Sequence, residues 1–361
     1  MKYNKLDRSK APHINPISHL TLPSPTFYQL DNGIPVYEIN GGTQDIIKLE
    51  LIFNAGRPVE HKPMVARATA GLLKEGTKQR KAAAIAERID YYGGSFSVPF
   101  NLDNATVALY SLTKHFDKLL PLVAEILTEA TFPEEEITSF IVRNQQSLLV
   151  ELSKTDVVAY RKITESIFTD QHPYGYNSTS ESYGSILRDD LLIHYQKHYN
   201  ASNCVIFISG KLDDHVRKLL NQHIGLGLSK GLVTPPYLPN VDTKPVSEFV
   251  HHPNAVQTAI RIGRRLFNRQ HPDYSAVYVL NTMLGGYFGS RLMSNIREEQ
   301  GYTYNIYSSI DAMLHDGYFY IGTEVGNEFL TQTLDEIRKE LLSLQQQPAD
   351  QEEMEMVKTI F

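Results

Sequence analysis

Two residues near the end of the chain have side chains suited to stabilising negative charge. Arg297 and Tyr304 lie seven positions apart in the segment GGYFGSRLMSNIREEQGYTY, which spans residues 285–304. A fixed cation and a phenol presented together can hold a peptide carbonyl oxygen as it becomes an oxyanion, because donors placed where charge develops stabilise the transition state. Neither group can cut a peptide bond alone. The pair therefore predicts half of an active site.

This segment and three shorter ones resemble a known family. The long segment is similar to the C-terminal signature of the pitrilysin/insulinase zinc peptidases, in the branch of the mitochondrial and small bacterial processing peptidases. The other markers are FPEEE at 132–136, HPYG at 172–175 and HYN at 198–200. The resemblance implies that Arg297 and Tyr304 are catalytic. It also implies that Gly285 and Gly286 belong to the substrate-binding segment, where the backbone turns tightly and approaches a neighbour.

The zinc motif that the resemblance implies is missing. Active members hold zinc through HXXEH on a helix and a distant glutamate. Here the five positions read RATAG, so Arg67 and Gly71 replace the two histidines and Ala70 replaces the general base. The third ligand is implied at Ser147, and Glu151, one helical turn further on, is the nearby carboxylate. Arginine is a permanent cation without a free lone pair. We therefore expect no metal and no cofactor in this chain.

Two histidine pairs are weaker candidates for a metal site. His194 and His198 lie four apart on an expected helix and could face one way, as metal-binding pairs do. A structural role is the favoured interpretation, because no glutamate between them has a useful role. His251 and His252 are expected beside the start of a strand, where neighbouring side chains point to opposite faces. A shared metal is not expected there.

Several other polar residues have simple structural interpretations. Glu60 and His61 are expected in an exposed loop, and the acids of FPEEE are expected at a helix N-terminus, where negative charge meets the positive end of the dipole. Cys204 lies in an apolar segment and is expected to be inert. As the single cysteine it cannot form an internal disulfide, which suits a reducing compartment.

Composition narrows the function classes. The chain has 361 residues, 42% of them hydrophobic and 21% charged, which is typical of a globular protein of about two domains. A net charge of −6 disfavours nucleic-acid binding. We find no secretory signal and no uncharged apolar run of about 18 residues, so a cytoplasmic protein without membrane association is expected. The helical pattern that ends at Phe361 has no cap, which leads us to expect that the natural protein continues.

One structural plan is repeated along the chain. Two alternating segments within 95–112 precede an amphipathic helix, a proline and acids, and the same order recurs from residue 303 onward. The repeat predicts an α+β fold of two homologous domains, each a mostly antiparallel sheet with helices packed on it. The expected bounds are 1–228 for the first domain, 229–246 for a Pro- and Gly-rich linker and 247–361 for the second domain.

Together these features predict a non-catalytic subunit of a zinc metalloendopeptidase, inactive alone. A homologous partner would carry HXXEH and the zinc, and the two chains would close around an unfolded peptide. The peptide would add as a strand to a sheet edge, while Arg297 and Tyr304 would bind its carbonyl. The alternative is a non-enzymatic structural or assembly protein that kept the peptidase fold.

Overall fold

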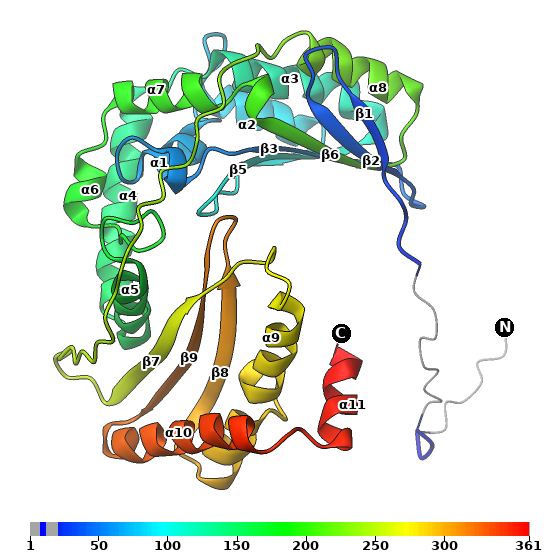
Figure 1. Ribbon diagram of the computed structural model, residues 1–361. Helices are drawn as coiled ribbons and strands as arrows, with labels where there is room; N and C mark the ends of the chain where they lie inside the picture. The colour runs from blue at the N-terminus through cyan, green and yellow to red at the C-terminus, as the bar shows by residue number, and fades with distance from the viewer. Residues whose placement is uncertain (1–7, 12–20, 361) are drawn as a thin grey trace.

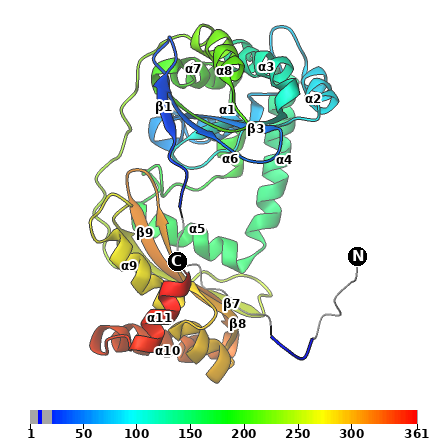
Figure 2. The same ribbon diagram turned by 90° about the vertical axis from the view of Figure 1, so that its right-hand side faces the viewer.

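The computed structural model describes residues 8–11 and 21–360, which form two β-sheets with helices packed on them (Figures 1 and 2). The first sheet has the strand order β1-β2-β6-β3-β5-β4. All neighbouring strands are antiparallel except β2 and β6, which run parallel. The strands are β1 (Thr26–Gln29), β2 (Pro35–Asn40), β3 (Ile46–Phe53), β4 (Ser95–Ser97), β5 (Ala105–Leu112) and β6 (Cys204–Gly210).

Buried and partly exposed side chains alternate along β3, so one face of the first sheet packs against helices. Every second residue from Ile47 to Phe53 is fully buried, while the intervening side chains reach the opposite face. In Figure 1 helices lie above this sheet and the second domain lies below it. The helices that precede the second sheet along the chain are α1 (Val65–Leu72), α2 (Ala82–Tyr91), α3 (Phe116–Glu129), α4 (Glu134–Leu152), α5 (Thr155–Phe168), α6 (Ser180–Gly184), α7 (Arg188–His198) and α8 (Asp214–Leu220).

The second sheet repeats the central unit of the first. Its order, β7-β9-β8, and its antiparallel directions match those of β3-β5-β4. In both units a short 3₁₀ turn and two helices follow the hairpin. The elements are β7 (Gln257–Leu266), β8 (Thr303–Ala312), β9 (Gly317–Gly326), α9 (Tyr274–Asn281), α10 (Leu330–Gln346), α11 (Gln351–Ile360) and the π-helical turns η5 (Thr282–Gly286) and η6 (Met293–Glu299).

The expected fold class is confirmed: the chain is α+β, with mostly antiparallel sheets and packed helices. The acids Glu134–Glu136 form the first turn of α4 after Pro133, as the FPEEE pattern indicated. Cys204 is buried at the start of β6, and burial raises the pKa of its thiol. Within residues 8–11 and 21–360, no helix combines the length and apolarity needed to cross a membrane.

A long coil joins the two sheets. No helix or strand occurs from residue 226 to residue 256, so the coil contains the segment 229–246 and continues beyond it. Contacts fix the coil to the first domain: the Tyr237 backbone N–H donates to the Pro58 carbonyl at 2.6 Å. His251 and His252 lie in this coil and not beside the start of a strand, because β7 begins only at Gln257.

Helix α5 crosses from the first domain to the second. It packs on β7 and β9, and Figure 2 shows it beside the second sheet. Phe168 of α5 is fully buried and packs edge-on against Tyr318 of β9, with ring centroids 5.8 Å apart. Asp103, between β4 and β5, adds a polar contact because it accepts hydrogen bonds from the Tyr174 hydroxyl and, at 2.7 Å, from the Leu314 backbone N–H.

Replacing Asp103 should weaken the joint between the domains. Asp103→Ala leaves the buried Tyr174 hydroxyl and the Leu314 N–H without their acceptor. Hydrogen bonds to charged groups contribute about 1.5–3 kcal/mol each. The exposed Leu314 N–H can bond to water instead, so the buried Tyr174 hydroxyl dominates and we expect the free energy of unfolding in urea to fall by about 2 kcal/mol. Asp170→Ala, at an exposed position, is the control. Equal stability of both variants would show that Asp103 does not join the domains.

Candidate functional site

The positions of the missing zinc motif lie on α1. Arg67 and Gly71 are exposed on one side of this helix, whereas Ala70 is buried. A four-residue spacing places two positions on one helical face, so the first and last positions of the motif do face the same way. A Cβ atom at Gly71 would lie 2.9 Å from the Phe140 ring of α4. Any side chain at position 71 therefore requires Phe140 to move.

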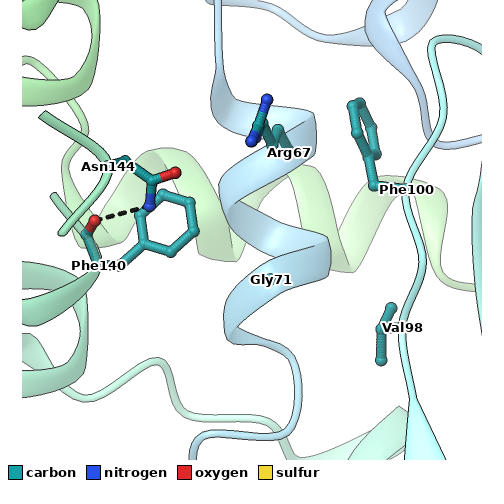
Figure 3. Close-up of a pocket in the computed structure, with 6 residues that line it drawn as sticks. All are labelled: Arg67, Gly71, Val98, Phe100, Phe140 and Asn144. Atoms are coloured by element: carbon teal, nitrogen blue, oxygen red, sulfur yellow. Dashed lines mark hydrogen bonds between the residues drawn. The ribbon is translucent and has the colours of Figure 1, made fainter. Parts of the chain in front are cut away.

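A pocket of about 390 Å³ occupies this face of α1 (Figure 3). Phe140 and Asn144, one turn apart on α4, form one wall of the pocket. The Asn144 side-chain NH₂ donates to the Phe140 carbonyl at 2.8 Å. Ser147 and Glu151 are exposed on α4 and do not line the pocket. The full lining is Arg67, Gly71, Val98, Phe100, Phe140 and Asn144.

The residues around this pocket do not fit zinc. They include no imidazole, thiolate or carboxylate, and the guanidinium of Arg67 would repel a cation. Across the part of the chain that the structure describes, no group of three or more His, Cys, Asp or Glu side chains could hold a metal ion. No chemical step in this chain is therefore assigned to a metal.

His194 and His198 are core residues of α7. Both are buried, with their ring centroids 4.6 Å apart, and the Nε2 atom of His194 lies 3.1 Å from the Ala55 carbonyl oxygen. Burial lowers the pKa of His194 to about 3 and that of His198 to about 4, because the charged form loses its hydration. Both rings are neutral at pH 7, which supports a structural role.

Glu60 does not lie in an exposed loop. Its carboxylate accepts hydrogen bonds from the Ala66 backbone N–H at 2.9 Å and from the Tyr176 hydroxyl. Burial raises its pKa to about 7. The carboxylate thus satisfies one of the free N–H groups in the first turn of α1. His61 is exposed, as expected, and its Nε2 atom is 3.3 Å from Asp190.

Arg297 and Tyr304 lie together in the second domain. The guanidinium carbon of Arg297, on η6, is 5.6 Å from the centroid of the Tyr304 ring and 4.5 Å from that of Phe288. Tyr304 is 88% exposed, so its phenol is available to a ligand. Its strand has a register shift between Thr303 and Ile306, where two residues stand opposite Glu324. Such a bulge redirects side chains, and here it presents Tyr304 to solvent.

Gly285 and Gly286 end the π-helical turn η5 beside the same strand. A Cβ atom at Gly285 would lie 2.4 Å from the backbone nitrogen of Ser308 in β8, which is too close for any side chain. At Gly286 the nearest contact would be 3.3 Å, to the Thr282 side chain. Gly285 is therefore required for close packing on the strand that carries Tyr304. The structure shows this packing role for Gly285.

Comparison with sequence families identifies the chain. Residues 65–172 match the family described as Insulinase (Peptidase family M16), and residues 185–361 match the Peptidase M16 inactive domain. The chain belongs to the M16 peptidase family. Its M16 motif helix is α1, and the part matched as the inactive domain includes Arg297, Tyr304 and the whole second sheet.

Curated relatives carry contrasting names. A Rickettsia bellii protein named "Uncharacterized zinc protease" is 26% identical over 92% of this chain and 80% of its own length. A Helicobacter pylori protein named "Non-peptidase homolog YmxG" is 25% identical over 78% of this chain and 66% of its own. Similarity of this degree thus extends to proteins named as peptidases and to one named as a non-peptidase.

Two solved structures share the architecture. The peptidase M16 inactive domain from Pseudomonas fluorescens superposes with a TM-score of 0.83 at 26% identity, covering 93% of this chain and 83% of that one. A protease from Helicobacter pylori superposes with a TM-score of 0.80 at 18% identity, covering 94% and 84%. These similarities establish the fold of the chain and agree with its membership of the M16 family.

Restoring a zinc site should require a ligand at position 144, which lines the pocket together with positions 67 and 71. We expect Arg67→His, Ala70→Glu and Gly71→His to bind zinc when combined with Asn144→Glu, because Asn144 lines the pocket. Phe140→Ala must accompany them to make room for the new imidazole. The matched control carries Ser147→Glu in place of Asn144→Glu. Metal analysis after dialysis should find near-stoichiometric zinc only in the combined variant that contains Asn144→Glu. Equal zinc contents would place the third ligand elsewhere.

The buried histidines should make stability depend on pH. Their folded pKa values lie below the unfolded value of about 6.5, so the unfolded chain binds protons first and stability falls as pH drops from 6.5 toward 4. Each histidine contributes a slope of up to about 1.4 kcal/mol per pH unit. His194→Gln should remove one such contribution, whereas the exposed His215→Gln should not. Urea unfolding at several pH values measures how the free energy of unfolding changes with pH in each protein. If His194→Gln and the wild type gave the same slope, His194 would not be the source of the pH dependence.

Proposed function

We propose that this chain is the metal-free subunit of a heterodimeric zinc metalloendopeptidase. It presents Arg297 and Tyr304 to an unfolded peptide held between it and a homologous partner that carries HXXEH. The metal chemistry belongs to the partner. This chain binds the peptide carbonyl and stabilises the oxyanion that develops on it. We assign the complex to the cytoplasm, because the single buried Cys204 needs no oxidising compartment.

The arrangement of Arg297 carries this proposal. Its guanidinium is held near two aromatic rings, those of Phe288 and Tyr304, and such contacts contribute about 0.5–1 kcal/mol each at exposed sites. Its ion pair with the neighbouring Glu298 is long, at 3.7 Å, and Glu298 is half exposed. Exposed pairs of this kind are worth little. The cation is thus oriented by its neighbours and remains available to an incoming oxygen.

The loss of the zinc residues supports the same division of labour. The pocket on α1 has no metal ligand, yet the bulge in β8 still displays Tyr304, and Gly285 still allows β8 to pack closely on η5. A chain that kept only a structural role would need neither an 88% exposed tyrosine nor an arginine beside it. Retention of this pair favours a role in binding substrate over assembly alone.

Mutation of the pair tests the proposal in the reconstituted complex. The native complex is purified through this chain, its zinc is measured, and steady-state cleavage of an unfolded peptide is followed. Arg297→Ala or Tyr304→Phe should lower kcat by about a hundred- to a thousandfold, because each removes one donor to the oxyanion. KM should change less than kcat, since the contacts strengthen in the transition state.

Two matched controls separate catalysis from folding and assembly. Arg338→Ala and Tyr91→Phe change an exposed arginine on α10 and a tyrosine that is 80% exposed on α2, and both should leave turnover unchanged. Sizing should show complexes of one size for all variants. Full turnover in both site variants, or a complex without zinc, would favour the structural role instead.

A further inference from the structure

The pocket that replaces the metal site has features of a site for an anion. Arg67 forms no ion pair and no hydrogen bond within the part of the chain that the structure describes, and it lies in a pocket with two aromatic walls, Phe100 and Phe140. The Arg67 side chain is exposed, so its guanidinium is accessible to an incoming negative group. A guanidinium offers a planar fork that matches a carboxylate.

Asn144 adds a second requirement for the ligand. Because its NH₂ group donates to the Phe140 carbonyl, the amide oxygen Oδ1 has no described donor, and Figure 3 shows this oxygen turned toward α1. The Asn144 oxygen can accept a hydrogen bond and the Arg67 guanidinium can pair with an anion. Together they suit a ligand group that carries both an acidic oxygen and an N–H. The last residue of a peptide is such a group, since its α-carboxylate is two bonds from its own amide N–H.

The neighbouring strand offers a path for the rest of that peptide. β4 is the last strand of the first sheet in the described residues, so the outer side of Ser95–Ser97 has no strand partner. Val98 and Phe100 follow β4 directly and line the pocket. An extended peptide can pair with such an edge through its backbone. A peptide that follows β4 would therefore bring its terminal residue to Arg67.

The pocket volume limits the ligand to a small terminal group. About 390 Å³ is near the lower end of the range for small-molecule sites, roughly 300–1,000 Å³. One apolar side chain with its carboxylate fits such a volume. The apolar walls, formed by Val98, Phe100 and Phe140, favour a residue such as leucine over a charged one.

We propose that this pocket binds the free C-terminus of a peptide with an apolar last residue. Arg67 pairs with the terminal carboxylate, Asn144 Oδ1 accepts the terminal amide N–H, and the aromatic walls hold the side chain. The ligand class rests on the proposed function, but this binding needs neither the partner nor its zinc. In a complex of both subunits, the site would anchor peptides by their free ends.

Binding of labelled peptides to the isolated full chain tests the proposal. The probes are a fluorescent heptapeptide that ends in leucine with a free carboxylate and the same peptide with a C-terminal amide. Fluorescence anisotropy should give a Kd at least tenfold lower for the acid, because only the acid pairs with Arg67. Equal affinities for the acid and the amide would overturn the proposal.

Variants assign the effect to the pocket. Arg67→Ala should weaken binding of the acid by about ten- to a hundredfold, in line with a charge-assisted contact, and leave the amide unchanged. Asn144→Asp should also weaken binding of the acid selectively, because it places a second negative charge beside the carboxylate. Arg143→Ala, an exposed neighbour on α4 that does not line the pocket, is the matched control and should bind normally. Thermal melts establish that each variant is folded.

Two further outcomes separate this site from its alternatives. If N-acetyl-leucine binds as tightly as the heptapeptide, the ligand is a small free acid and the peptide assignment is wrong. If the acid peptide binds through Arg67 while Arg297→Ala leaves turnover intact, the pocket stands and the proposed function fails. If Arg297→Ala loses turnover while the acid and the amide bind equally, the proposed function stands and the pocket proposal fails.

Discussion

The packing of α1 on α4 is the contact on which the arrangement of the molecule depends. The Phe140 ring lies against the bare backbone of Gly71, and a side chain at that position would force the helices apart or displace the ring. A short turn at residues 153–154 joins α4 to α5, and α5 packs on the second sheet. The Phe140–Gly71 contact therefore lies within the series of helices that links the first domain to the sheet that carries Tyr304. In zinc-binding relatives, as the family resemblance implies, a metal would join these two helices.

The three-stranded unit that occurs twice is completed differently in each domain. In the first domain β6, β2 and β1 extend the sheet beyond β3. In the second, α5 covers one face of the sheet, where Tyr318 and Tyr320 point, and Ile321 packs on the opposite side with Ile296 and Ile337. Because β8 holds the place of β4 in this unit, Tyr304 lies on the strand that corresponds to β4.

Patterns of residue type predicted the fold well and the local geometry only in part. Alternation and helical spacing are properties of neighbouring residues, so they indicated the repeated hairpins, the α4 start after Pro133 and the segment that brings Arg297 near Tyr304. The third-ligand position depended on a count from Gly71 across three helices and a hairpin. That count led to the exposed Ser147, one turn beyond Asn144. The buried state of Glu60 and the bulge before Ile306 depend on contacts distant in sequence, which no local pattern records.

Because of helix α5, the boundary between the two halves along the chain differs from the boundary between them in space. Along the chain the division falls in the coil after residue 225, but in space the second sheet is packed on a helix that precedes that coil by more than fifty residues. Ile163, Ile167 and Phe168 form part of one apolar cluster with Tyr318 and Tyr320. The covalent link through the coil is thus secondary to this cluster in holding the halves together. A break in the coil would leave this apolar cluster as the contact between the two pieces, since all of its members lie outside the coil.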